Sequence, residues 1–427
     1  MGSEIEYNSA SNRGQILPNV VDVSAPDAQP PEVELILACA GLGTASERAE
    51  RIRSLAGAGP DWSCVLKNAA WHGMMPLLNQ ELEAACPDRV PEAVRDELKN
   101  QYCRTLAHNL LLKGELVTLV KLFEAEEIPA IPFKGPLLAD AFYRNLALRQ
   151  FWDLDILVHR HDALRAKELL VARGYHPAKD LSHEKEQDLL ESDCEYPLVG
   201  IDGKVIVEIH WQILPPHQAF GYKSDYLWDR AVPAPLEDVT TLTLRPEDLL
   251  LILCIHAGEK HHWSLLKWIC DVARLISVHD SMEWDRIFME SSQLGRERTV
   301  SLALFLANML LGAPLPASIA ERVRNDPRNA ASAGHIRGRL FCEDIGLPGF
   351  LEWLRTVKSM ERTVSGKASE LSRWSYLLRY LKVILTPEWT DRQGLPLPTP
   401  LSLLHYLSRT TRLLAKHHIG LIRRLFD

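Results

Sequence analysis

Three features that would assign the chain to a special class are missing from its 427 residues. No apolar run is long enough to cross a bilayer. Residues 1–30 are polar and contain no apolar segment of the kind that signal peptides carry. The eight cysteines are scattered, without a Cys-x-x-Cys spacing. These absences favour a cytoplasmic protein whose cysteines are buried, reduced thiols.

An excess of positive charge is also missing. The net charge is −8 and the isoelectric point lies near 6.1, whereas general nucleic-acid binding needs clustered cations. Residues 351–427 differ, with 13 Lys and Arg against 6 Asp and Glu. This basic segment could face an anionic acceptor, but a solvated helix face is the favoured interpretation. We therefore expect no general affinity for nucleic acids.

The length predicts two or three domains, and the pattern along the chain divides it further. Residues 1–31 read as a disordered lead. Apolar residues at helical spacing predict an N-terminal helical domain over 32–127. Short strands alternate with helices over 128–245, the predicted catalytic domain. Residues 246–427 are again helical, with a Pro-rich connector at 393–400.

The most informative residues are two aspartates, Asp153 and Asp155, in the apolar strand predicted over 151–158. Side chains two apart on a strand share a face, about 6.5–7 Å apart at Cα, so both carboxylates can hold one Mg²⁺ or Mn²⁺ ion or bridge two. A strand end with solvated acids is the alternative. A hairpin over 195–211 contributes Glu208, which is costly to bury unless paired or metal-bound.

A second group of residues is suited to phosphate. The strand predicted over 128–133 leads through Lys134 and Gly135 into a helix predicted over 136–143, with proline in its first turn. Free backbone N–H groups at such a turn favour an anion. The Lys134 side chain adds a point charge, and Arg149 could supply a second cation.

The order of these motifs resembles the bacterial nucleotidyltransferase family of the DNA-polymerase-β-like superfamily. The segments 70–78 and 256–271 are also similar to helical segments of that family. The resemblance implies an α+β fold, in which a polymerase-β-like core of a small mixed sheet with helices is flanked by N-terminal and C-terminal helical domains. It also implies Mg²⁺ or Mn²⁺ as cofactor and an NTP as substrate.

Carried over residue by residue, the resemblance assigns two sets of site residues. The catalytic and metal-binding residues are Asp153, Asp155 and Glu208. The nucleotide-binding residues are Lys134, Gly135, Lys267 and Asp271, to which Arg149 is added because of its charge. One departure is that the superfamily usually places Gly-Ser at the start of the first core helix, where this chain has Lys134 and Gly135, so the phosphate-binding hydroxyl is absent.

The helix predicted from Pro246 to Ile276 can be interpreted in two ways. Lys267 and Asp271 are four residues apart and share a face, as in a surface ion pair. Alternatively, the helix closes over the sheet and both residues border the nucleotide. The nearby Trp263 and Trp268 are expected to pack in the core rather than stack on a base.

A cluster of histidines precedes this helix. His256, His261 and His262 lack a nearby cysteine or a fourth ligand, so no structural zinc site is expected there.

Two hypotheses of different class follow. The first is an enzyme that transfers an NMP group from NTP to an acceptor. The second is a catalytically silent nucleotide-binding or scaffold protein that uses its helical flanks for a partner. The presence of all three acids favours the enzyme. Relatives resemble accessory enzymes of natural-product and polysaccharide biosynthesis, which suggests a small molecule or peptide as acceptor, with a protein or tRNA left open.

Overall fold

The computed structural model of the chain describes residues 30–178, 181–214 and 225–341. Residues 1–29 of the lead predicted over 1–31 lie outside the described residues, as do the basic segment after residue 350, the Pro-rich connector and Cys342. Pro31, which was assigned to the lead, is the first residue of a helix. Within the described ranges, no helix is both long and apolar enough to cross a membrane.

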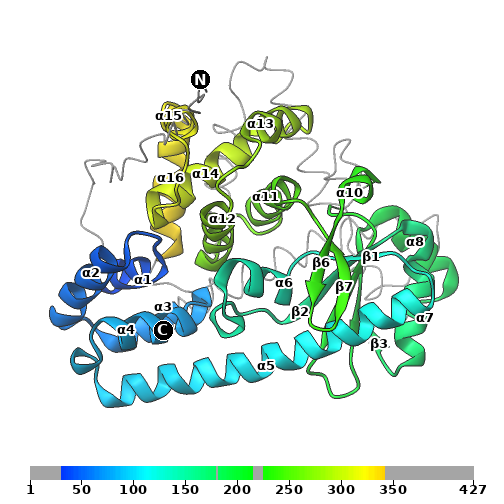
Figure 1. The fold of residues 1–427 in the computed structure, drawn as a ribbon, viewed down its shortest axis with the longest axis horizontal. Coiled ribbons are helices and arrows are strands. Elements are labelled where there is room, and N and C mark those ends of the chain that lie inside the picture. The colour runs from blue at the N-terminus through cyan, green and yellow to red at the C-terminus, as the bar shows by residue number, and fades with distance from the viewer. Residues whose placement is uncertain (1–29, 179–180, 215–224, 342–427) are drawn as a thin grey trace, which may run out of the picture.

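Helices dominate both ends of the described chain (Figure 1). Capping residues set some of their ends: Thr44 and Asp61 accept backbone N–H bonds at two starts, and Gly73 ends a helix in the left-handed conformation. The N-terminal helices are α1 (Pro31–Ala40), α2 (Ala45–Gly57), α3 (Trp62–His72), α4 (Met75–Ala85) and α5 (Glu92–Ala125). The C-terminal helices are α11 (Pro246–Ile255), α12 (Leu266–Val278), α13 (Trp284–Gln293), α14 (Glu297–Leu311), α15 (Ala317–Arg324) and α16 (Pro327–Leu340).

A small mixed sheet lies between these helical segments in the sequence, as predicted. Its strands, in spatial order, are β1 (Ala130–Pro132), β2 (Asp153–Val158), β5 (Ile206–His210), β4 (Glu195–Val199) and β3 (His176–Pro177). Among the described strands of this sheet, β2 and β5 are the one parallel pair. The predicted hairpin is the pair β4 and β5. A separate two-stranded sheet consists of β6 (Val232–Leu236) and β7 (Val239–Thr243).

Shorter helices accompany the sheet. They are α6 (Pro136–Leu138), the π-helix η2 (Ala139–Tyr143), the 3₁₀ helices η3 (Leu146–Leu148) and η4 (Arg160–Asp162), and α7 (Ala163–Ala172), α8 (His183–Ser192) and α10 (Asp225–Arg230). The helix expected over 136–143 is present and begins with Pro136, but after one α-turn the backbone continues as a π-helix. The helix expected from Pro246 to Ile276 is likewise interrupted, by the π-helix η5 (His256–Lys260) and an irregular segment over 261–265.

Two hydrophobic cores organise the described residues. The first contains buried side chains from α1 to the start of α5 and from α11 to α16, so the N-terminal and C-terminal helical segments pack together rather than apart. The second contains most buried residues of the sheet, α7 and the later part of α5, whereas Ile131 of β1 and Leu157 of β2 belong to the first. The domain boundaries inferred from the sequence remain a prediction. Described residues of the two predicted helical domains, 32–127 and 246–427, share one core.

Helix α5 connects the two cores. Its 34 residues correspond to a length of about 51 Å. Val94 and Leu98 are buried in the first core, whereas the second core contains Leu112, Leu116, Leu119, Val120 and Phe123. Figure 1 shows α5 running from α4 to the strands. This helix therefore fixes the sheet relative to the helical core.

The turn between β1 and α6 requires glycine. Gly135 has φ 60° and ψ −126°, a combination that L-residues with a side chain avoid. A Cβ at this position would lie 3.4 Å from the backbone oxygen of Asp153. Gly135 therefore brings the Lys134 turn against the start of β2, where the first strand aspartate lies.

Replacing Gly135 with alanine should lower the free energy of unfolding by about 1–3 kcal/mol, because the strained backbone conformation would be retained with a Cβ present. Chemical denaturation measures this change. Gly114→Ala is the control, since Gly114 lies on the exposed part of α5 with open space around it. That substitution should raise the free energy of unfolding by about 0.5–1 kcal/mol. Equal effects at both positions would contradict the backbone argument.

Candidate active site

The strand acids meet on one face of the sheet because of strand register. Asp155 is paired with Glu208 across the parallel β2 and β5 strands, and side chains at paired positions lie on the same face. Asp155, Glu208 and His210 each offer a ligand atom within 4.8 Å of the other two. The Glu208 side chain is 21% exposed, so solvent reaches the group from one side.

Asp155 is held between two cationic groups. Lys134 Nζ donates to Asp155 Oδ1 at 2.8 Å, and His210 Nε2 lies 3.1 Å from the same oxygen. Burial alone would raise the pKa of Asp155, but the Lys134 charge and the His210 hydrogen bond hold that pKa well below its usual value. Asp155 is therefore ionised at neutral pH.

His210 takes part in a second group on the same face. Burial alone would lower the pKa of His210, but its hydrogen bond to Asp155 and the neighbouring acids raise that pKa well above the usual value. On the other side of the ring, Nδ1 lies 3.7 Å from Glu195 Oε2. Glu195 in turn accepts from Lys260 Nζ at 3.0 Å. One imidazole thus connects the predicted acids with a further carboxylate.

Asp153 is near Asp155 and Glu208, but it is not part of the group whose ligand atoms lie within 4.8 Å of one another. Burial raises its pKa to about 6, and the negative charges of Asp155 and Glu208 add to the shift. The charges of the other two predicted acids therefore contribute to the raised pKa of Asp153.

Two π-helices border the site, a type of helix common at functional sites. In η5, His256 Nε2 lies 3.3 Å from Lys134 Nζ and 3.3 Å from His261 Nε2. Burial and the Lys134 charge lower the pKa of His256, so this ring is neutral. The residues that follow, His262 and Trp263, have positive φ of 51° and 56°, which side chains other than glycine adopt rarely.

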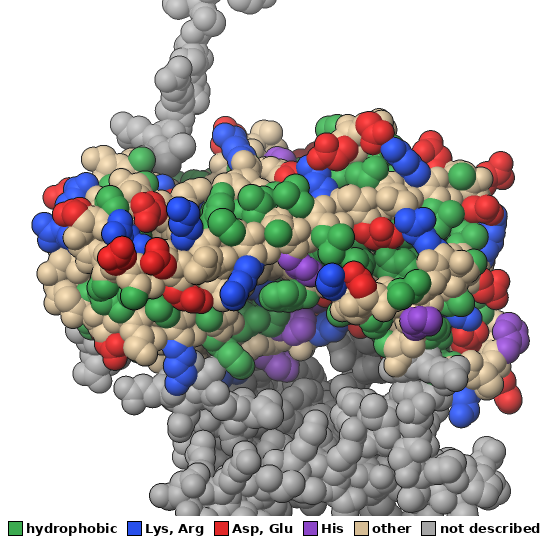
Figure 2. Space-filling model, turned by 90° about the horizontal axis from the view of Figure 1, so that it is seen from below, with side chains coloured by type: hydrophobic (Ala, Val, Ile, Leu, Met, Phe, Trp, Pro, Cys, Tyr) green, Lys and Arg blue, Asp and Glu red, His purple; other side chains and the backbone are tan. Residues whose placement is uncertain are grey.

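The two tryptophans near η5 have different surroundings. Trp263 is 1% exposed and packs in the core, as expected. Trp268 stacks on His261 with ring centroids 4.2 Å apart. In Figure 2, histidine and Lys or Arg side chains gather near the middle of one face of the molecule, next to hydrophobic side chains.

Arg149 and Asp271, both predicted to contact the nucleotide, form an ion pair with each other. Arg149 Nε and Nη2 donate to the two oxygens of Asp271 at 2.8 and 2.9 Å, and Tyr143 donates to Oδ1 at 2.8 Å. The side chains of the pair are 8% and 2% exposed. Asn109 of α5 donates to the backbone oxygens of Leu146 and Arg149, which holds this loop in place.

The surface ion pair considered for Lys267 and Asp271 is therefore wrong, because Arg149 takes the carboxylate. Lys267 stays close: burial and the Arg149 charge lower its pKa, and the Asp153 and Asp271 charges oppose that shift. Of the eight predicted site residues, the structure brings Lys134, Gly135, Asp153, Asp155 and Glu208 together around β2 and places the other three at one border.

The sequence analysis did not assign Glu195, His210, His256 or Lys260 to the site. The first two could have been found from the predicted hairpin, because a turn around Asp202–Gly203 pairs Glu195 with His210, as observed. The other two lie in the segment 256–271 that resembles the family, but their contact with the sheet could not be predicted, because η5 reaches the sheet only through tertiary packing.

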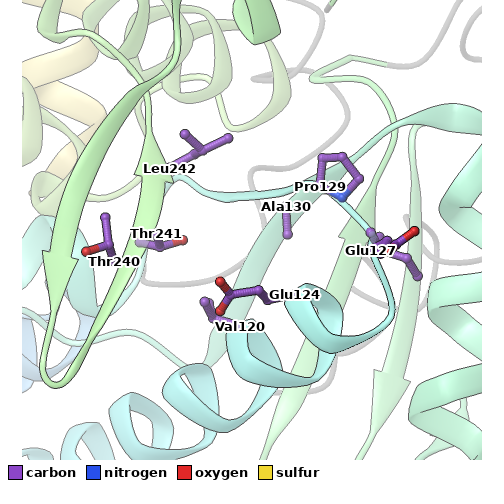
Figure 3. Close-up of a pocket in the computed structure, with 9 residues that line it drawn as sticks. Val120, Glu124, Glu127, Pro129, Ala130, Thr240, Thr241 and Leu242 are labelled. Atoms are coloured by element: carbon purple, nitrogen blue, oxygen red, sulfur yellow. The ribbon is translucent and has the colours of Figure 1, made fainter.

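A shallow pocket of about 320 Å³ lies away from these residues. Figure 3 shows it between α5, the start of β1 and β7. Its lining residues are Val120, Glu124, Glu127, Ile128, Pro129, Ala130, Thr240, Thr241 and Leu242. None of the predicted site residues contributes to it, so this pocket is not part of the candidate active site.

Comparison with known proteins gives a family. A sequence profile described as "Uncharacterised nucleotidyltransferase" matches residues 58–312, more than half of the chain. A search of curated proteins found no match. Among solved structures, an antigenic nucleotidyltransferase-like protein from Paracoccidioides brasiliensis aligns over 52% of this chain and 91% of its own, with 14% identity and a TM-score of 0.32.

Removing the Asp271 charge should be costly. Asp271→Asn leaves the buried Arg149 guanidinium without its carboxylate, so the free energy of unfolding should fall by about 3–5 kcal/mol. Urea denaturation at pH 7.5 measures it. Glu297→Gln, which breaks the half-exposed pair with Arg322, is the control and should change the value by less than about 1 kcal/mol. If both variants lost less than about 1 kcal/mol of unfolding free energy, the buried ion pair would not be a major contribution to stability.

The raised pKa of Asp153 predicts a pH dependence. Between about pH 4 and 6 the folded protein keeps a proton on Asp153 that the unfolded chain has lost, so this group destabilises the fold progressively as the pH rises through that window. Asp153→Asn removes the effect. The free energy of unfolding of the variant minus that of wild type should be about 1–3 kcal/mol higher at pH 7.5 than at pH 4. Denaturation of both proteins at each pH measures this difference. A difference independent of pH would contradict the shifted pKa.

Proposed function

We propose that this chain, which belongs to the "Uncharacterised nucleotidyltransferase" family, transfers an NMP group from an NTP to an acceptor hydroxyl or phosphate with the help of divalent metal. The observation that carries the proposal is the pairing of Asp155 with Glu208 across parallel strands, with Asp153 close enough for its pKa to respond to both. The order of these acids on the strands also supports membership of the DNA-polymerase-β-like superfamily.

The donor set fits Mg²⁺ or Mn²⁺. The Asp155 and Glu208 side chains offer hard oxygen ligands within 4.8 Å of each other, which is the chemistry these ions prefer. Asp153 and these two residues would hold the metal. When bound, the metal neutralises charge on the phosphates and lowers the pKa of an attacking hydroxyl.

The carboxylates carry out the proton chemistry. In the proposed reaction an acceptor oxygen forms a bond to the α-phosphorus, the bond from that phosphorus to the β-phosphate oxygen breaks, and pyrophosphate leaves. Glu208, which solvent reaches, takes the proton from the acceptor. Asp155 is already ionised by its cationic neighbours and does not compete for that proton.

The cations near the acids suit a triphosphate. Lys134 lies at the Gly135 turn, and Lys260 and Lys267 lie on η5 and α12 across from the sheet. The Lys134 and Lys260 ammonium groups are held by carboxylates of the sheet. Arrival of the nucleotide and its metal would give these lysines phosphate partners, so that they stabilise the leaving pyrophosphate. Arg149 contributes by keeping Asp271 and α12 in position rather than by direct contact.

The alternative is a catalytically silent nucleotide-binding or scaffold protein. Incubation of the purified chain with each α-³²P-labelled NTP, Mg²⁺ and a cell extract separates the two, because only the enzyme leaves label on an acceptor. Nucleotide binding without transfer of label from any NTP would favour the silent protein.

Changing the acids should abolish transfer. Asp155→Asn and Glu208→Gln should each lower the rate of NMP transfer by about 10²-fold or more, because each removes a stabilising charge at the reacting phosphate. Glu191→Gln is the control, since the Glu191 side chain is 75% exposed and pairs with Arg160. Circular dichroism confirms the fold of each variant. Rates within about threefold of wild type, well short of that loss, would refute the assignment.

A further inference from the structure

A second set of ligand atoms lies on the far side of the His210 ring from Asp155. Cys194 Sγ, a Glu195 carboxylate oxygen and a His210 ring nitrogen all lie within 4.8 Å of one another. Cys194 directly precedes β4, and Glu195 is the cross-strand partner of His210. Strand pairing therefore fixes all three positions. His210 is the one residue that this group shares with the group of Asp155, Glu208 and His210.

One atom of this set has only weak partners. His210 Nδ1 is buried without a well-formed hydrogen bond among the described residues, and the side chain is only 3% exposed. The groups that face it are the Cys194 thiol and the Glu195 carboxylate. A buried polar atom with such incomplete partners is costly. Nδ1 faces Glu195 Oε2 at 3.7 Å, too far for a hydrogen bond but suited to an ion between them.

The separations match those of a tetrahedral transition-metal ion. With metal–ligand bonds of about 2.0–2.3 Å, tetrahedral ligand atoms lie roughly 3.4–3.6 Å apart. Here Nδ1 and Glu195 Oε2 are 3.7 Å apart, and Cys194 Sγ and the same oxygen are 3.8 Å apart. Small side-chain movements would therefore complete the coordination.

The donor types select the metal. Thiolate and imidazole suit Zn²⁺ and not Mg²⁺, whereas the all-oxygen pair of Asp155 and Glu208 suits Mg²⁺. Access is open at one edge, because the Glu195 side chain is 21% exposed and Lys260, which contacts both Glu195 oxygens, is 37% exposed. Lys260 can keep Oε1 while Oε2 binds a metal.

We propose that Cys194, Glu195 and His210 Nδ1 form a zinc site with an open fourth position, next to the candidate active site. With Nδ1 on the metal, the ring proton lies on Nε2 and is donated to Asp155, which is 3.1 Å away. A carboxylate that accepts the second N–H of a metal-bound histidine fixes the ring orientation and strengthens the ligand. The site thus links zinc binding to the position of Asp155. It does not depend on the proposed transferase activity.

Cobalt titration of the full chain, freed of metal by chelation, tests the proposal. Co²⁺ replaces Zn²⁺ and gives a near-ultraviolet charge-transfer band only when a thiolate binds it. We expect this band in wild type, its loss in Cys194→Ser, and a decrease in Zn²⁺ affinity of at least about 100-fold. Cys103→Ser, which removes an exposed thiol, is the matched control. It should keep the charge-transfer band and the wild-type affinity for Zn²⁺.

Two further variants keep the test decisive. Glu195→Gln retains the thiol and should weaken Zn²⁺ binding even if the Cys194 variant fails to fold. Asp155→Asn should keep the band and lose about 10–100-fold in affinity, as for removal of a residue that orients a ligand. Cobalt binding without the band, or zinc binding that is abolished by Asp155→Asn and unchanged by Cys194→Ser, would overturn the site.

Discussion

The bidentate ion pair between Arg149 and Asp271 is the interaction on which the arrangement of the site depends. It joins the loop that enters β2 to helix α12, 122 residues later. With 8% and 2% of the side chains exposed, the two charges have little water to solvate them, and each is stabilised chiefly by the other. Asn109 holds the same loop from α5. The start of β2 is therefore fixed from both sides.

The site crowds several charges into a small volume. Asp153, Asp155 and Glu208 repel one another, and Lys134 and His210 offset that repulsion at Asp155. Such crowding is unfavourable for folding and is typical of sites where charge is needed for chemistry. The folded chain thus holds its acids in a state that an added cation would stabilise. His210 lies at the centre, since its two ring nitrogens face different carboxylates.

Much of the fold followed from local patterns. The strand with Asp153 and Asp155, the hairpin that carries Glu208 and the helical character of both flanks were all predicted, because they rest on alternation, turn residues and helical spacing. The pairing of Asp155 with Glu208 could not be read in this way, since it depends on a parallel contact between strands 53 positions apart. The π-helices η2 and η5 were also missed, because a helical hydrophobic pattern does not distinguish them from α-helices.

The sequence by itself determined the chemical types available at the site: paired carboxylates, a lysine before a glycine turn, and a histidine two residues after an acid. Only the tertiary structure decided which of these groups meet. Arg149 and Asp271 were predicted from the sequence to bind the nucleotide. Packing of α12 against the loop before β2 makes them a buried ion pair. Conversely, Lys260 and His256 reach the sheet because α11 packs in the shared helical core. The physical reason is that residue type sets what a side chain can bind, whereas long-range packing sets its partner and its exposure to water.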